Sequence, residues 1–245
     1  MFEAEIKNEV LKEVLSVVST LVDEAKFTFN AQGLHLKVVD PAHVAMADIT
    51  LSSKAFESYK AQETSLGIDI KKLMDVIKLA KPGDVIKLTH DEEKNSLIVK
   101  VSNITRRMQL VDTSSISDPK VPNLTLPVSL KLEASHLTQG IRASESVSDH
   151  ITLTVSAEGF ELSSKGDTDY VNLKLPKDLI KEINCSENVK SMFSLSYFSN
   201  MIKSVGTGND VSLSLGTDYP IMMEFEISEG KGRVKYLLAP RIEGD

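Results

Sequence analysis

Apolar residues recur at helical spacing near the start of the chain and alternate with polar residues in the segments that follow. The first stripe consists of Val10, Leu11, Val14, Leu15, Val18, Leu21 and Val22. This spacing predicts a helix with one buried face. A second, shorter helix is predicted over 70–80, where Ile70, Leu73, Ile77 and Ala80 share a face.

Alternating segments after each helix predict strands. They cover 26–40, 44–52, 85–91 and 96–103. The first segment contains a four-residue turn that ends at Gly33, and glycine adopts the positive φ that such turns need. "KPGD" at 81–84 is expected to end the second helix. Helices that are each followed by several hairpins indicate an α+β fold with antiparallel sheets.

The pattern occurs twice along the chain. Segment 9–36 matches segment 135–162 at an offset of 126, so that Ala31-Gln32-Gly33 corresponds to Ala157-Glu158-Gly159. Segment 68–85 then matches 193–211, with Lys78 corresponding to Lys203. Because the matches recur in the same order, we interpret the chain as two tandem copies of one helix-plus-antiparallel-sheet unit.

A stretch without periodicity separates the two copies. "DTSSISDPKVPNLTLP" (112–127) contains three prolines and lacks helical or strand spacing, which is typical of a connector. The predicted organisation is therefore an N-terminal domain over 1–111, a connector over 112–127 and a C-terminal domain over 128–245.

Composition narrows the class of protein. The 245 residues include 41% hydrophobic and only 5% aromatic residues, which predicts a mostly aliphatic core. Cys185 is the single cysteine, so an internal disulfide is excluded. The start "MFEAEIKNEV" does not resemble a signal peptide, and no apolar run is long enough for a membrane span. We expect a soluble intracellular protein.

Positive charge is concentrated on the helices of an acidic chain. The net charge is −7, yet segments 7–21, 69–81, 134–147 and 195–205 together carry eight basic and five acidic residues. If the four segments share one face, that face is mildly basic on an otherwise acidic body. On charge alone, such a face is more often a plain solvated surface. The repeat favours a shared functional face, because it places two helices of each copy in equivalent positions.

No motif indicates catalysis, a metal or a cofactor. The five histidines are scattered, "GTGND" lacks the lysine of a phosphate-binding loop, and no nucleophile motif is present. We therefore predict no catalytic residue, no metal, no cofactor and no enzymatic activity.

Five segments resemble one known family. "MFEAEI" at the start, "VDPAHVAMADITL" (39–51), the "AQG" and "AEG" turns, and "LLAPRIE" (237–243) are similar to the sliding clamp of archaea and eukaryotes, proliferating cell nuclear antigen. The resemblance covers the whole chain, and the short acidic tail is closer to archaeal members. It implies the DNA clamp fold, a closed homotrimeric ring and a processivity factor for DNA replication and repair.

The resemblance also implies partners and their sites. Duplex DNA would pass through the ring without sequence readout, facing basic residues of the helices: Lys12, Lys71, Lys78, Lys81, Arg142 and Lys203. A DNA polymerase, an ATP-driven clamp loader, flap endonuclease, DNA ligase and other proteins would bind through a short motif with a glutamine and apolar and aromatic anchors. The matching pocket residues are Val39, His43, Val44, Val121, Pro122, Leu124, Pro220, Leu237, Ala239, Pro240 and Ile242. The apolar chain end would then be an exposed docking surface.

Two long strands are expected at subunit boundaries. Segments 103–112 and 167–175 read as edge strands, and unpaired edges invite pairing with another chain. The expected interface residues are Arg106, Met108, Leu110, Tyr170, Asn172 and Lys174. The expected location is the cytoplasm, associated with the nucleoid, for an archaeal protein and the nucleus for a eukaryotic one.

Two alternatives remain from the residues alone. One is a non-ring protein that binds nucleic acid or peptides as an adaptor, although exposed aromatic residues for base stacking are scarce. The other is a hydrolase without a standard motif.

Overall fold

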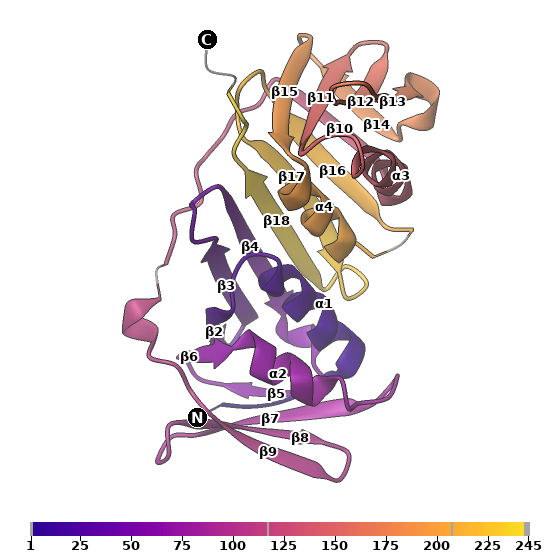
Figure 1. Cartoon of the computed structure of the whole chain (residues 1–245). Helices are drawn as coiled ribbons and strands as arrows, with labels where there is room; N and C mark the ends of the chain where they lie inside the picture. Colours follow the sequence, from indigo (N-terminus) through magenta and orange to yellow (C-terminus); the bar gives the residue numbers. More distant parts are fainter. Residues whose placement is uncertain (1, 117, 207, 243–245) are drawn as a thin grey trace. The chain divides into compact units, whose positions relative to one another are not determined.

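The computed structural model describes residues 2–116, 118–206 and 208–242. The chain forms two compact units, one of Met1–Val121 with Glu226–Val234 and the other of Pro122–Phe225 with Lys235–Asp245. Each unit combines two helices with antiparallel strands (Figure 1). Within the described ranges, no helix has the length and apolar character needed to cross a membrane.

The first unit contains nine strands before the connector. They are β1 (Phe2–Lys7), β2 (Glu24–Asn30), β3 (Gly33–Val39), β4 (Ala45–Ser52), β5 (Ser58–Ala61), β6 (Thr64–Asp69), β7 (Val85–Asp91), β8 (Ser96–Val101) and β9 (Ile104–Gln109). Its helices are α1 (Asn8–Ser19) and α2 (Ile70–Ile77), with 3₁₀ turns η1 (Ser53–Ala55) and η2 (Thr113–Ser115). The strands run in the orders β5–β1–β7–β8–β9 and β4–β3–β2–β6.

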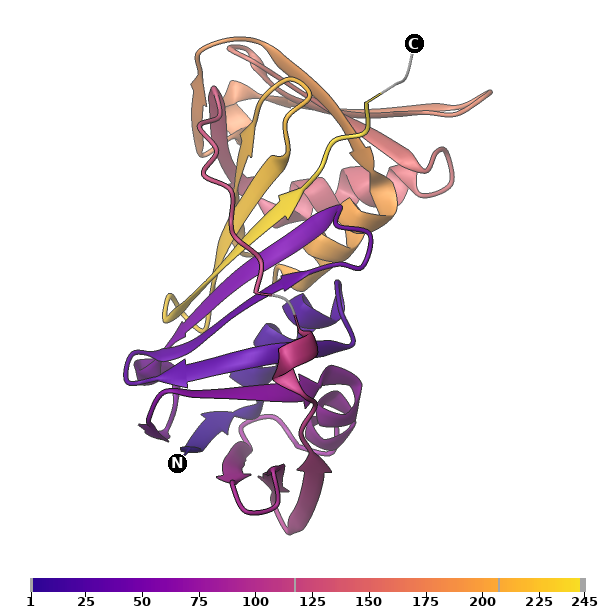
Figure 2. The same cartoon turned by 90° about the vertical axis from the view of Figure 1, so that its left-hand side faces the viewer.

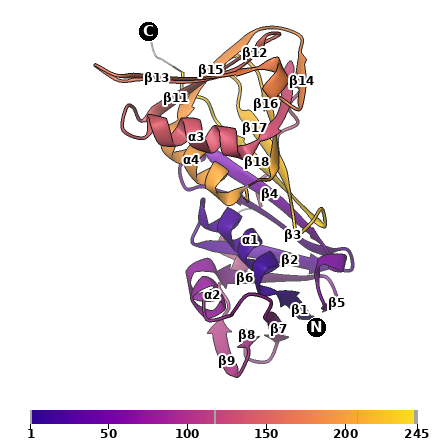
Figure 3. The same cartoon turned by 90° about the vertical axis from the view of Figure 1, so that its right-hand side faces the viewer.

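Helices α1 and α2 lie beside each other over the strands of the first unit (Figure 3). Their apolar stripes are buried, as the spacing predicts, with Leu11, Leu15 and Leu73 almost fully covered. Both helices end earlier than predicted. Thr20 Oγ1 donates to the Val17 carbonyl at 2.7 Å, and Leu79 N–H donates three residues back to Val76. These tight terminal turns replace the last helical turn, because they satisfy carbonyls that the helix leaves unpaired.

Three aromatic residues form a cluster in the core of the first unit. The Phe2 and Phe29 rings stack with centroids 4.0 Å apart, and Phe27 and Phe29 lie 6.4 Å apart. All three side chains are buried. The other buried apolar side chains of this unit are aliphatic, so the expectation of a mostly aliphatic core is confirmed.

The second unit repeats the arrangement. Its strands are β10 (Val128–Glu133), β11 (His150–Ser156), β12 (Gly159–Lys165), β13 (Tyr170–Pro176), β14 (Glu182–Cys185), β15 (Val189–Ser194), β16 (Asp210–Leu215), β17 (Ile221–Ile227) and β18 (Gly232–Leu238). Its helices are α3 (Ala134–Ser144) and α4 (Leu195–Ser204), with a 3₁₀ turn η3 (Lys177–Leu179). The strand orders are β14–β10–β16–β17–β18 and β13–β12–β11–β15.

Equivalent glycines close equivalent turns in the two units. Gly33 pairs with Ser52, and Gly159 pairs with Pro176. Their φ angles are 137° and 150°, as predicted for the two turns. A Cβ atom at either glycine would collide with the carbonyl oxygen of Leu51 or Leu175, so only glycine fits. The α+β repeat predicted from the sequence is confirmed.

The start of α2 depends on an aspartate that its counterpart helix lacks. Asp69 accepts from the Lys72 backbone N–H at 2.8 Å, and this hydrogen bond holds the pKa of Asp69 below its usual value. Ser194 stands at the same place before α4 but makes no capping hydrogen bond with its side chain. Asp69→Ala is expected to lower the free energy of unfolding by about 1 kcal/mol, whereas Ser194→Ala is expected to have little effect.

The effect of the Asp69 cap depends on pH. Because the folded-state pKa is lowered, the stabilisation is complete above the ordinary pKa of aspartate and is lost as the pH falls through the folded-state value. Urea unfolding of both variants between pH 7 and pH 3 measures this. Equal stability of Asp69→Ala and Ser194→Ala at pH 7 would contradict the capping role.

Candidate functional site

The predicted DNA-facing cations lie on or just after the helices, away from the buried stripes. Lys71, Lys78, Lys81, Arg142 and Lys203 are exposed and Lys12 is half-buried. In the second unit α3 and α4 lie side by side, as α1 and α2 do in the first (Figure 3). Each helix pair therefore presents a polar face that carries basic residues.

Part of this positive charge is neutralised within each unit. Lys78 Nζ lies 3.5 Å from Asp75 Oδ1, and Lys203 Nζ lies 3.5 Å from Glu145 Oε1. These two lysines occupy equivalent positions in the repeat. Lys71, Lys81 and Arg142 form no ion pair in the part of the chain that the structure describes, so their charges are the most available to a ligand.

A polar cleft of about 340 Å³ opens on the helix side of the second unit. Lys203 and Arg241 line it together with the carboxylates of Glu145 and Asp149. Ser199 Oγ donates to Glu145 Oε1 at 3.2 Å. Equal numbers of acidic and basic groups leave this cleft without a strong net field.

One buried carboxylate builds the loop of "DPAHV". Asp40 accepts from the backbone N–H groups of Ala42, Val44 and Ala45 at 3.0, 2.8 and 2.6 Å. His43, whose φ is 56°, is exposed at the tip of the loop. Asp40 thus sets the positions of three predicted pocket residues: Val39, His43 and Val44. Sequence reasoning did not select Asp40, although an aspartate before proline is a known turn signal.

The other predicted pocket residues differ in exposure. Val121, Leu124, Pro220, Ala239 and Pro240 are half-buried, whereas Pro122 and Ile242 are exposed. Leu237 is only 5% exposed and belongs to β18, where Tyr236 and Leu238 are also buried. The expectation that the apolar chain end is exposed is therefore wrong for these three residues, because the strand completes a sheet. The accessible apolar end consists of Ala239, Pro240 and Ile242; the acidic tail, 243–245, lies outside the described residues.

Polar contacts hold the segment after β18 and the start of the connector in place. Arg241 N–H donates to the Met192 carbonyl at 2.7 Å, which fixes the segment after β18 beside β15. At the start of the connector, Asp112 caps η2 through the Ser114 N–H, and Lys26 forms an ion pair with Asp118 at 3.2 Å. Figure 2 shows η2 and the extended chain that follows it.

The two strands expected at subunit boundaries lie at sheet edges. β9 ends one sheet of the first unit and β13 ends one sheet of the second unit. On β9, Met108 is buried while Arg106 is exposed, and Leu110 is buried just after the strand. On β13, the side chains of Tyr170, Asn172 and Lys174 are exposed. Val171 and Leu173, which the prediction omitted, alternate with them and are half-buried.

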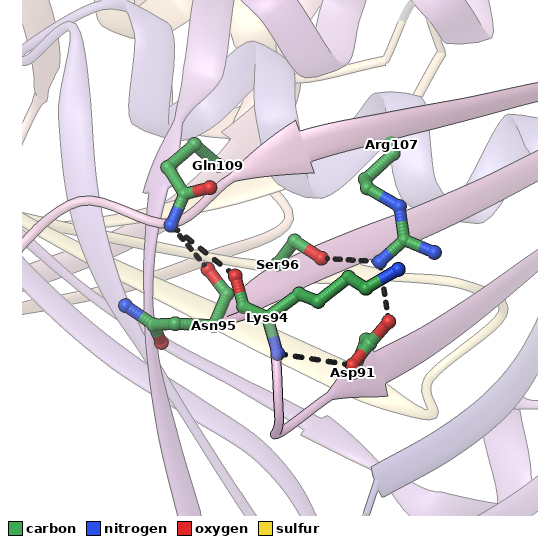
Figure 4. A network of polar contacts seen from close by, with 6 residues as sticks. All are labelled: Asp91, Lys94, Asn95, Ser96, Arg107 and Gln109. Carbon is green, nitrogen blue, oxygen red and sulfur yellow. Dashed lines mark hydrogen bonds and ion pairs between the residues drawn. The ribbon is translucent and has the colours of Figure 1, made fainter.

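Polar contacts fix the solvent side of β9 (Figure 4). Arg107 Nη1 binds Asp91 Oδ2 and donates to Ser96 Oγ at 2.9 Å. Gln109 Nε2 donates to the Asn95 carbonyl at 2.9 Å. The Arg107 hydrogen bond also holds the pKa of Asp91 below its usual range. The edge strand is therefore positioned by its own unit.

Among the described residues, no group of three or more His, Cys, Asp or Glu side chains could hold a metal ion. What the geometry presents is a set of surfaces: basic helix faces, a loop held by the buried Asp40 carboxylate, and two open strand edges. Such surfaces suit the binding of other macromolecules.

Comparison with protein families identifies both halves of the chain. The model described as proliferating cell nuclear antigen, N-terminal domain, matches residues 1–116. The model of the C-terminal domain of the same antigen matches residues 120–241.

Similar proteins share the full length of the chain. A DNA polymerase sliding clamp of Methanosarcina barkeri is 39% identical over 246 residues, and one of Natronomonas pharaonis is 36% identical over 248; each match covers 100% of both chains. The solved structure of A. fulgidus PCNA with the C-terminal region of FEN-1 bound has a TM-score of 0.94, 33% identity and 100% coverage of both chains. PCNA of Thermococcus kodakaraensis has the same fold, with a TM-score of 0.92, 23% identity, and coverage of 98% of this chain and 100% of that one.

The role of the buried Asp40 in holding the "DPAHV" loop can be tested by substitution. Asp40→Ala removes the acceptor of three backbone N–H groups, and is expected to lower the free energy of unfolding by at least about 2 kcal/mol. Glu93→Ala is the control, because it removes an exposed carboxylate and is expected to change stability by less than about 0.5 kcal/mol. Urea denaturation measures both. Equal stability of the two variants would show that the carboxylate does not hold the loop.

Proposed function

The chain belongs to the proliferating cell nuclear antigen family, and we propose that three copies of it close into a ring that encircles duplex DNA and tethers the replicative DNA polymerase. Members of this family are sliding clamps, which act as processivity factors and are not enzymes. The observation that carries the proposal is the match of both family domains, in order, along a chain that aligns end to end with archaeal sliding clamps.

Charge on the helices supports contact with DNA. The four helical segments carry a surplus of three positive charges in each chain, so a ring of three would present nine. Attraction of this kind acts on phosphates and carries no sequence information. A ring is retained on DNA by its closure, so this modest surplus is sufficient and leaves the clamp free to slide.

Partner proteins are proposed to bind beside the "DPAHV" loop and the chain end. In the A. fulgidus complex the bound partner is the C-terminal region of FEN-1. By extension we propose that this chain binds flap endonuclease, DNA polymerase, DNA ligase and the ATP-driven clamp loader. The pocket would use Val39, His43, Val44, the connector residues and Ile242, and its half-buried apolar side chains suit a short helical turn with apolar anchors.

The same proposal includes the domain limits and the cellular location of the protein. The division into 1–111, 112–127 and 128–245 stays a prediction, and the structure adds that residues 226–234 cluster with the first unit. Relatives at this identity are archaeal, so we propose a cytoplasmic protein that associates with the nucleoid.

Molar mass in solution tests the ring directly. Light scattering at micromolar concentration is expected to give about three times the 26.9 kDa of one chain. A monomer at all accessible concentrations would contradict the ring and favour a non-ring adaptor.

The internal ion pairs predict unequal effects of the helix cations on DNA binding. Lys81→Gln is expected to weaken binding of a linear duplex at low salt and to reduce the salt dependence, because the Lys81 side chain forms no ion pair with any described residue. Lys78→Gln is expected to have a smaller effect, since Asp75 already neutralises Lys78. Removing a phosphate contact lowers the logarithmic salt slope by about 1.

Fluorescence anisotropy of a labelled duplex across a salt series measures both slopes. Lys94→Gln, in the β7–β8 turn, is the control for loss of one positive charge elsewhere. A larger loss for Lys78→Gln than for Lys81→Gln would contradict the proposed neutralisation.

The exposed chain end predicts which apolar residues bind a partner motif. Ile242 is 73% exposed, so Ile242→Ser leaves the core intact while removing an anchor for a peptide with the glutamine–apolar–aromatic motif. Loss of such an anchor is expected to weaken binding about tenfold. Leu79→Ser is the control, because Leu79 is also an exposed large apolar residue, at 59%, and lies on the helix side of the first unit.

Calorimetry with the peptide, combined with light scattering on the same sample, separates the pocket from assembly. The ring is expected to persist in both variants. Unchanged peptide affinity for Ile242→Ser would exclude Ile242 from the pocket.

A further inference from the structure

The start of α1 lies against the turn that follows α2. Strands β1 and β7 are antiparallel, with Lys7 opposite Val85. The residue after β1 therefore meets the residue before β7, and the Asn8 N–H donates to the Asp84 carbonyl at 2.9 Å. This register places the first turn of α1 beside the "KPGD" turn, 81–84, although the two are far apart along the chain.

Glu9, in the first turn of α1, binds the backbone of this turn. Glu9 Oε1 accepts from the Gly83 N–H at 2.6 Å. This hydrogen bond is the main reason why the pKa of Glu9 lies below its usual value, and the positive charges of Lys12 and Lys7 lower it further. An ionised carboxylate makes a stronger hydrogen bond than a neutral acceptor does. Glu9 therefore ties the turn to α1.

The tip of the turn stands in open space. Gly83 has a φ of 84°, and a Cβ atom placed on it would have no heavy atom of the described residues within 4 Å. Within the turn, the Lys81 N–H donates to Asp84 Oδ2 at 2.8 Å, and the Asp84 N–H donates to the Lys81 carbonyl at 3.1 Å. These bonds join Lys81 to the residue that follows Gly83. The position of the Lys81 backbone therefore depends on where Glu9 holds Gly83.

The residue before Glu9 orients a second basic side chain. Asn8 is buried, and in the amide orientation that satisfies both of its ends, Nδ2 donates to the Ile77 carbonyl at 3.2 Å and Oδ1 accepts from Lys12 Nζ at 3.0 Å. Because the amide is neutral, it orients Lys12 without forming an ion pair. The start of α1 thus contacts both the end of α2 and the cations around it.

The second unit has a similar turn without a carboxylate on it. The Ala134 N–H donates to the Asn209 carbonyl at 3.0 Å, as Asn8 does to its counterpart. Ser135 stands where the first unit has its glutamate, but its hydroxyl donates to a side chain two residues before it. The turn itself, 206–209, contains no basic residue. The carboxylate therefore occurs in the unit whose turn carries a lysine.

We propose that Glu9 is a positioning residue, which holds Lys81 in place for contact with DNA by fixing the backbone of the turn. This inference rests on the proposed contact between the helices and duplex DNA. Charge alone predicts the opposite role for Glu9, because removing a carboxylate beside basic residues strengthens their attraction for phosphates. The two accounts therefore predict changes of opposite sign when the carboxylate is removed.

Glu9→Ala and Glu9→Gln separate the two accounts. Both remove one negative charge, but glutamine keeps an oxygen that can accept from the Gly83 N–H. Glu9→Ala is expected to weaken binding of a labelled linear duplex at low salt about twofold to fivefold, whereas Glu9→Gln is expected to bind at least as tightly as the parent. The charge control is Asp23→Ala, which removes an exposed carboxylate from the segment after α1 and is expected to tighten binding slightly.

A double-mutant cycle shows whether Glu9 acts through Lys81. In a Lys81→Gln background the turn has no cation to present, so Glu9→Ala is expected to cause no further loss of affinity. An equal loss of affinity in the parent and in the Lys81→Gln background would contradict the proposal. Binding by Glu9→Ala that is as tight as binding by Glu9→Gln would contradict it as well.

Hydrogen exchange without DNA tests the hold on the turn separately. Exchange in the segment 81–84, followed by mass spectrometry, is expected to be at least about tenfold faster in Glu9→Ala than in the parent, with Glu9→Gln in between. Unchanged exchange would show that Glu9 does not fix the turn. Faster exchange with unchanged duplex binding by Glu9→Ala overturns only the positioning role, whereas a parent protein that does not bind duplex contradicts the proposed function itself.

Discussion

The structure depends on burying one apolar stripe of each helix against antiparallel strands. Leu15 of α1, Leu73 of α2 and Phe198 of α4 are almost fully covered in their units. Because these stripes face inward, the polar side of each helix faces outward with its basic residues. In the same arrangement the outer strands β9 and β13 pair with a neighbouring strand on one side only, since a hairpin-built sheet ends at an edge. Basic helix faces and open edges are thus two consequences of one arrangement.

Because the unit occurs twice, equivalent positions of the two halves can be compared directly. At the start of the second helix, Asp69 caps α2, whereas Ser194 leaves α4 uncapped. At the end of the outer strand, Ser52 donates a hydrogen bond that Pro176 cannot donate. Segment 226–234 lies against the edge of β4 within the first unit, whereas the edge of the equivalent strand β13 is open. A repeat whose two edges have diverged in this way is suited to assembling with further copies of itself.

Much of the fold could be predicted from the sequence because it follows from local patterns. Helical spacing located α1 and α2, alternation located the strands, and the glycine turns at Gly33 and Gly159 follow from a local steric need. The basic residues of the helices were predictable for the same reason.

Features that depend on distant residues were not predictable from local patterns. The three N–H groups that converge on Asp40, the stacking of Phe2 on Phe29, and the pairing of Lys203 with Glu145 all require the folded chain. Leu237 was assigned to the pocket through the family resemblance, and the structure shows that strand β18 buries it. Alternation alone could not show that this end completes a sheet.

The central claim is that the protein holds DNA by closing around it. The most direct measurement is retention on nicked circular DNA after loading, washed at high salt and then treated with a nuclease that linearises the circle. Encirclement predicts that the protein stays on the circle, because salt screens charge but does not open a ring, and that it leaves rapidly once the DNA has ends. Loss from the intact circle at high salt, or retention after linearisation, would contradict the account.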